Sequence, residues 1–137
     1  MDRYPWLELT LREPVRIAAL EIQGNVYEKR TDNIYYFKNV EIMAGMEKTD
    51  LTQGQAASAM ETKNSVSVIY KGPLKYEVTE YVTFPQPYKT SKYLMIQRNQ
   101  NGASQMELAE VKVFGESPLI SLNNNTKICL SWSWFLN

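Results

Sequence analysis

Two segments near the C-terminal end constrain the fold most. Residues 92–97 (KYLMIQ) and 105–115 (QMELAEVKVFG) are apolar and strand-like, and a polar segment, residues 99–104, separates them. Alternating segments of this kind predict β-strands, and the Asn101-Gly102 pair between them is a strong signal for a hairpin turn. The sequence therefore predicts a long β-hairpin here.

The second of these segments switches its hydrophobic alternation between Leu108 and Val111. Met106 and Leu108 share one parity, whereas Val111 and Val113 take the other. A strand whose apolar parity switches is either covered on both faces or carries a bulge, and bulges often lie beside binding sites. Glu110, at the switch, is therefore a candidate functional residue. The alternative is an outward-facing carboxylate without a function.

The remaining sequence also favours short strands. The strand-like segments are residues 6–11, 15–23, 35–44, 66–70 and 76–84. Turn signals separate them, at Glu13-Pro14 and Gly72-Pro73 for example, and residues 46–65 are predicted to form a long loop. Short strands between turns, with no convincing helix, predict an all-β antiparallel sandwich or barrel.

Three of these segments give more detailed predictions. In residues 15–23 the apolar parity switches between Ile17 and Leu20. In residues 35–44, Val40, Ile42 and Ala44 are expected to point inward and Met43 outward. In residues 76–84, the inward-facing residues are expected to be Val78, Val82 and Phe84.

A change in character after Gly115 sets the predicted domain boundary. Residues 117–137 show no regular hydrophobic pattern. We therefore predict one domain over residues 1–116 and an irregular C-terminal tail, residues 117–137, outside the core.

Composition excludes several functional classes. The chain of 137 residues has no histidine, which removes the commonest general base and the commonest zinc ligand. Lys and Arg together number 15, as do Asp and Glu, so the chain has no net charge and nucleic-acid binding is not expected. No apolar run is long enough to span a membrane, and no signal-peptide pattern is visible. The sequence predicts a non-enzyme.

The segment Glu28–Asn33 (EKRTDN) is the best candidate for a binding loop. It combines a guanidinium, an ammonium and a carboxylate, and Tyr36 follows it closely. Sugar recognition uses planar donors and acceptors for vicinal hydroxyls, next to an aromatic face. The alternative is a solvated loop in which Arg30 and Asp32 form a weak surface ion pair.

Several motifs, in order, resemble a known fold family. Residues 5–11 (PWLELTL) and 14–22 (PVRIAALEI) resemble the opening of the galactose-binding-like jelly rolls, which include discoidin domains and F-type lectins (fucolectins). Residues 39–45 (NVEIMAG) resemble the next lectin strand. Residues 93–97 (YLMIQ) and 108–115 (LAEVKVFG) resemble the C-terminal signature of the fucolectins. The resemblance implies a β-sandwich jelly roll over about residues 5–115.

The resemblance also implies a sugar site. The fucose motif of the lectins is a His followed by Arg-x-Asp and a further basic residue. Arg30 and Asp32 match the middle of this motif, and Lys38 or Tyr36 falls near its last position. Because this chain has no His, the motif is degenerate and a changed sugar specificity is expected. The implied partners are glycans or glycoproteins. The sequence leaves open whether the chain forms a homo-oligomer.

A calcium site is implied only in part. Glu110 and the backbone carbonyl of Ala109 stand where the lectins have calcium ligands. The other ligands of the family come from a loop before the Pro5-Trp6 strand, and this sequence has no counterpart of that first strand region. The family resemblance implies an extracellular location. The alternatives are a discoidin-like adhesion or protein-interaction module, and a partial gene product that binds no ligand.

Overall fold

The computed structural model describes residues 5–24, 37–48, 66–75, 77–98, 106 and 108–117, and the backbone of residues 127–133. These residues contain seven strands and no helix. The strands are β1 (Trp6–Gln23), β2 (Val40–Gly45), β3 (Val66–Tyr70), β4 (Thr79–Thr83), β5 (Thr90–Arg98), β6 (Glu110–Glu116) and β7 (Lys127–Ser133).

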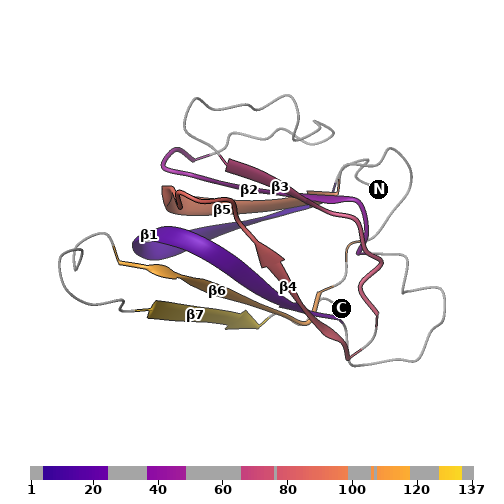
Figure 1. Ribbon diagram of the computed structural model, residues 1–137. Helices are drawn as coiled ribbons and strands as arrows, with labels where there is room; N and C mark the ends of the chain where they lie inside the picture. The colour runs from indigo at the N-terminus through magenta and orange to yellow at the C-terminus, as the bar shows by residue number, and fades with distance from the viewer. Residues whose placement is uncertain are drawn as a thin grey trace.

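All seven strands belong to one antiparallel sheet that wraps around a core. The strand order is β3-β2-β5-β1-β6-β7, and β4 pairs with β1 off this path. The first part of β1 pairs with β5, and its last part pairs with β6 on one edge and β4 on the other. Figure 1 shows β2, β3 and β5 above the core and β6 and β7 below it, with β4 crossing in front. The predicted all-β antiparallel class is confirmed.

β1 is one strand of 18 residues, not two strands separated by a turn at Glu13-Pro14. Its pairing with β5 shifts register between Thr10 and Val15, so the predicted turn is an irregularity within a continuous strand. A second shift lies between Ile17 and Ala19 in the pairing with β6. This shift confirms the predicted parity switch, because one extra residue moves the inward-facing set to the other parity.

β5 and β6 do not form the predicted hairpin, because β1 lies between them. β5 pairs with β1 and β2, whereas β6 pairs with β1 and β7. Both edges of each strand are therefore occupied by other partners. An Asn-Gly pair favours a tight turn locally, but it cannot determine which edges remain free for pairing. The Asn101-Gly102 turn itself lies outside the described residues.

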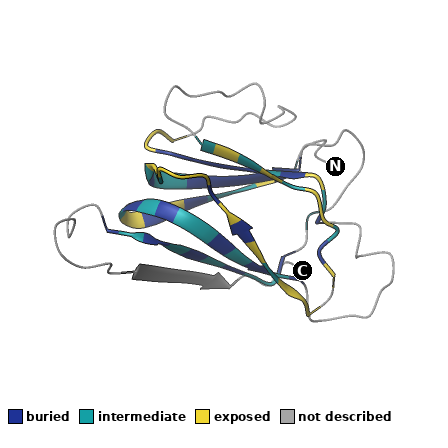
Figure 2. Cartoon of the chain, viewed as in Figure 1, coloured by how far each residue is buried: buried dark blue, intermediate teal, exposed yellow. Residues whose placement is uncertain are grey.

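The core consists mainly of the inward-facing residues of β1, β2, β5 and β6, coloured dark blue in Figure 2. As predicted, Val40, Ile42 and Ala44 are buried, and so are Val82 and Phe84. Met43 points away from this core, as predicted, but it is still buried, since it packs against Met95 in a small separate cluster. The predicted inward orientation of Val78 was wrong. Val78 is 37% exposed because β4 begins only at Thr79, after Val78.

The prediction of an irregular tail was wrong for residues 127–133. This segment forms β7 and pairs antiparallel with the whole of β6, from Glu110↔Ser133 to Glu116↔Lys127. The outer edge of β6 offers unpaired backbone donors and acceptors, and a strand that pairs with it satisfies them. Residues 127–133 are thus part of the sheet.

Candidate functional site

The predicted binding loop joins the end of β1 to the start of β2. Of its candidate residues, Arg30, Asp32 and Tyr36 lie outside the described residues, and Lys38 lies within them. The structure does describe both points at which the chain enters and leaves this loop. These two points define the place of the site in the fold.

The entry point is Gly24, directly after β1. Its N–H donates to the carbonyl of Val78 at 3.1 Å. A Cβ added at Gly24 would lie 2.0 Å from the backbone oxygen of Lys75. Because a backbone oxygen cannot move aside as a flexible side chain can, only glycine fits this close approach.

The exit point is Phe37 to Asn39. The Leu74 N–H donates to the carbonyl of Phe37 at 2.9 Å, and the Asn39 N–H donates to the carbonyl of Lys71 at 3.0 Å. Phe37 is fully buried, and these bonds hold the neighbouring Lys38, which is half-buried, at a defined position. Entry and exit are therefore both attached to one segment, residues 71–78.

Ala109 and Glu110 lie beside the entry point. The Ala109 N–H donates to the carbonyl of Gln23 at 2.9 Å, and Glu110 is the register partner of Gln23. The structure thus brings the two candidate calcium residues next to the start of the loop that contains Arg30 and Asp32. Gln23 and Glu110 are far apart in the sequence, and they pair at one end of the sheet.

The parity switch at Glu110 has a structural explanation. β6 begins at Glu110, and the chain bends at Ala109 immediately before it. Leu108 is buried although it precedes the strand, whereas Val111 and Val113 are buried within it. The two parities therefore belong to two different backbone conformations, and β6 is shorter than the predicted strand.

Glu110 belongs to a charge network across β1 and β6. The Lys112 Nζ lies 3.9 Å from Glu110 Oε2 and 3.5 Å from Glu21 Oε1. Glu21 also accepts a hydrogen bond from Tyr81, which raises the pKa of that phenol. Within the part of the chain that the structure describes, no group of three or more acidic or Cys residues could hold a metal ion.

Sequence analysis missed a hydrogen bond between two strands that do not pair. The Tyr70 hydroxyl on β3 donates to Glu80 Oε2 on β4 at 2.5 Å. Burial and this hydrogen bond raise the pKa of Tyr70. In the sequence, Glu80 shares its parity with the apolar residues Val82 and Phe84. This signal could have drawn attention to the carboxylate, but it does not indicate that Tyr70 is the partner.

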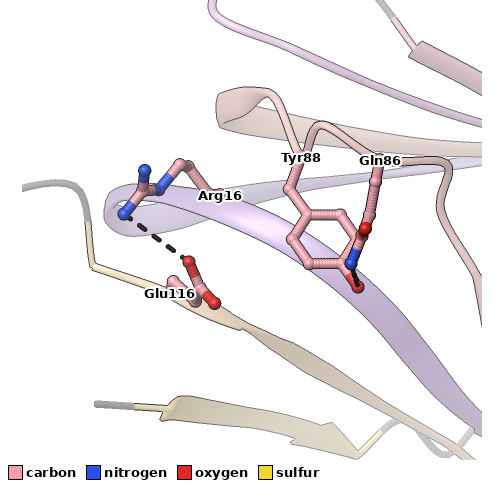
Figure 3. A network of polar contacts seen from close by, with 4 residues as sticks. All are labelled: Arg16, Gln86, Tyr88 and Glu116. Carbon is pink, nitrogen blue, oxygen red and sulfur yellow. Dashed lines mark hydrogen bonds and ion pairs between the residues drawn. The ribbon is translucent and has the colours of Figure 1, made fainter. Parts of the chain in front are cut away.

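Figure 3 shows two further polar contacts, one between β1 and β6 and one in the loop before β5. The Arg16 Nη2 lies 3.5 Å from Glu116 Oε2, and both side chains are partly exposed. In the loop before β5, Gln86 Nε2 donates to the Tyr88 hydroxyl at 3.1 Å. Neither pair contains a candidate residue of the binding loop.

Comparison with known proteins assigns no identity. No family model, curated protein or solved structure matches the chain. Among the described residues, no helix is both long and apolar enough to cross a membrane.

Proposed function

We propose that this chain is a non-catalytic carbohydrate-binding module of fucolectin type, on a galactose-binding-like β-sandwich jelly roll. The observation that supports it is that both ends of the candidate loop and Glu110 lie close to the end of β1. Both ends of the loop with Arg30 and Asp32 are fixed to residues 71–78, and Glu110 lies beside its entry. A loop held at both ends can present its side chains to a ligand at a lower entropic cost.

The residue types suit hydroxyl recognition. Arg30 would donate in-plane hydrogen bonds to neighbouring sugar hydroxyls, and Asp32 would accept from them. Tyr36 offers an aromatic face for the apolar side of the ring. Lys38, at the anchored exit, adds a cationic donor. The ligand class that follows is a neutral or fucosylated glycan.

Glycan-array screening followed by calorimetric titration of the best glycan tests this function. We expect Arg30→Ala and Asp32→Ala each to weaken binding at least about tenfold, because each removes a charged hydrogen-bond partner worth roughly 1.5 to 3 kcal/mol. Lys89→Ala is the matched control, since Lys89 is an exposed cation before β5. The proposal fails if no glycan binds, or if the Arg30 and Lys89 variants bind equally well.

For calcium, we propose that Ala109 and Glu110 form an incomplete site. One carboxylate and one carbonyl are fewer than the six to eight oxygens that calcium takes. We therefore expect millimolar calcium to leave the melting temperature unchanged, within about 1 °C, for both wild type and Glu110→Gln. A clear rise in the wild type alone would show that other ligands complete the site.

A discoidin-like protein-interaction module is the second candidate. Two large apolar side chains, Ile69 and Tyr81, are each 65% exposed on strands β3 and β4. Exposed apolar residues on neighbouring strands suit protein contacts. Competition distinguishes the two functions, because free sugar would displace a glycoprotein partner but not a partner held by these apolar residues. In either case we propose that the protein acts outside the cell.

A further inference from the structure

The segment between β3 and β4 is bonded to both ends of the proposed binding loop. We call the described residues of this segment, 71–75 and 77–78, the strap. At the entry of the loop the strap accepts a hydrogen bond from the Gly24 N–H. At the exit it accepts one from the Asn39 N–H and donates one to the carbonyl of Phe37. The strap therefore links the two ends of the loop through backbone hydrogen bonds.

The strap also packs closely against the exit of the loop and against the core. Its residue Leu74 is buried in the main hydrophobic cluster. A Cβ added at Gly72, where φ is 64°, would lie 2.6 Å from the backbone oxygen of Phe37. The strap and the exit are thus in direct backbone contact at this point. A displacement of the strap would therefore also displace the backbone next to Lys38.

A side-chain hydrogen bond joins the two ends of the strap. Tyr70 is the last residue of β3, and its hydroxyl donates to Glu80, the second residue of β4, at 2.5 Å. Among the described strands, β3 pairs with β2 and β4 pairs with β1, so no backbone ladder joins β3 to β4. The bond is partly buried, which strengthens it relative to a bond in water. It therefore fastens the start of the strap to its end.

We propose that Tyr70 and Glu80 are positioning residues for the binding loop. Their hydrogen bond keeps the strap in place, and when it breaks the strap separates from the core together with both ends of the loop, as one unit. This inference rests on the proposed sugar site and names the contact that keeps that site in shape. Segments outside the central strands open at a lower free energy than the whole fold does. The strap lies outside the strands, so it meets this condition.

Hydrogen exchange of the ligand-free full chain, followed by NMR at neutral pH, tests this unit. The reporters are the amides of Gly24, Asn39 and Leu74, each of which donates one of the bonds between loop and strap. We expect Tyr70→Phe to speed their exchange by one common factor, about five- to thirtyfold, because it removes a hydrogen bond to a carboxylate. Glu80→Ala should have the same effect. Glu80→Gln keeps an acceptor oxygen and should have a smaller one.

Gly115→Ala is the matched control that separates local opening from global unfolding. It disturbs the contact of β6 with β1 near Ile17, away from the end of β1 where the strap is bonded, and should destabilise the whole fold. If the strap opens on its own, this variant leaves exchange at the reporter amides unchanged. The proposal is overturned if Gly115→Ala speeds the reporters as much as Tyr70→Phe does. It is also overturned if Tyr70→Phe leaves them unchanged.

A glycan titration distinguishes this inference from the proposed function. If a glycan binds to the loop, a saturating concentration should slow exchange at Gly24 and Asn39 in the wild type, since the strap would open only after the glycan dissociates. A glycan that binds without slowing either amide would show that loop and strap are not coupled, and the inference fails. If no glycan binds, the proposed function fails, and the ligand-free variants then decide whether the strap opens as a unit.

Discussion

Tyr70 joins two strands that the described backbone ladder does not pair. Its hydroxyl donates to Glu80 on β4, and its ring lies 5.6 Å from the ring of Phe37 at a tilt of 46°. Phe37 is also the anchored exit of the proposed binding loop. One tyrosine therefore closes the gap between β3 and β4 and packs against the residue that positions Lys38.

Replacing Tyr70 with Phe should remove the hydrogen bond and keep the ring contact. We expect a loss of about 1 to 2 kcal/mol in the free energy of unfolding, because the acceptor is a carboxylate and the pair is only partly buried. Urea unfolding at neutral pH measures this. Tyr81→Phe serves as the control. Because Tyr81 is 65% exposed, this substitution should lower the free energy of unfolding by less than about 1 kcal/mol.

The same pair predicts a dependence on alkaline pH. Burial and the hydrogen bond to Glu80 raise the pKa of Tyr70 in the folded state, whereas in the unfolded chain tyrosine titrates near pH 10. The stabilisation is therefore complete below about pH 10 and is lost as the pH rises above it. Unfolding at about pH 8 and about pH 11 should show a larger loss in wild type than in Tyr70→Phe. Equal losses would show that Tyr70 titrates normally.

At the level of single strands, the sequence predicted which residues face the core far better than which strands pair with each other. The bounds of β3 were predicted correctly, and so was the parity switch between Ile17 and Leu20. These features depend on neighbours within one strand. The hairpin of β5 with β6 was wrong because pairing depends on which distant edges are free, and alternation contains no such information.

For the candidate site, too, the sequence indicated the residues but not their contacts with distant parts of the chain. The residue types of the loop, and the break at Glu110, could be read from the sequence. The attachment of Gly24 and Phe37 to residues 71–78 could not, because it consists of backbone hydrogen bonds across long sequence separations. The backbone groups of almost any residue can form such bonds, so the side-chain sequence does not indicate where they occur.

Substitution of Gly115 tests the close packing between β1 and β6. A Cβ at this position would lie 2.4 Å from the backbone oxygen of Arg16 and 2.4 Å from Cγ1 of Val15. We expect Gly115→Ala to lower the free energy of unfolding by about 1 to 3 kcal/mol, since β1 and β6 would have to separate locally. Chemical denaturation measures it. Glu116→Ala removes only a surface ion pair next to it and should cost less than about 1 kcal/mol.

At the scale of the whole molecule, one sheet forms the fold and β7 completes one of its sides. β7 covers the edge of β6 along its whole length, and β6 contains Val111 and Val113 of the core. A chain that ends at Ser117 would leave this edge open. Residues 127–133 therefore contribute to stability, and the alternation of Ile128, Leu130 and Trp132 with smaller residues was a strand signal that the prediction of an irregular tail overlooked.

Ending the chain at Ser117 should lower stability by a few kcal/mol, a large share of what a domain of this size has. The exposed edge of β6 should also increase aggregation. Thermal unfolding and light scattering of the shortened and full chains measure both effects. Equal melting temperatures and equal scattering would contradict the role of β7.

We propose that the anchored end of β1 binds glycans, and amide chemical shifts during a glycan titration are the sharpest test of this site. We expect saturable shifts that cluster at Gly24, Lys38, Ala109 and Glu110, around the two ends of the binding loop. Shifts that cluster instead at the Gln86–Tyr88 loop, or no shift with any glycan, would contradict it.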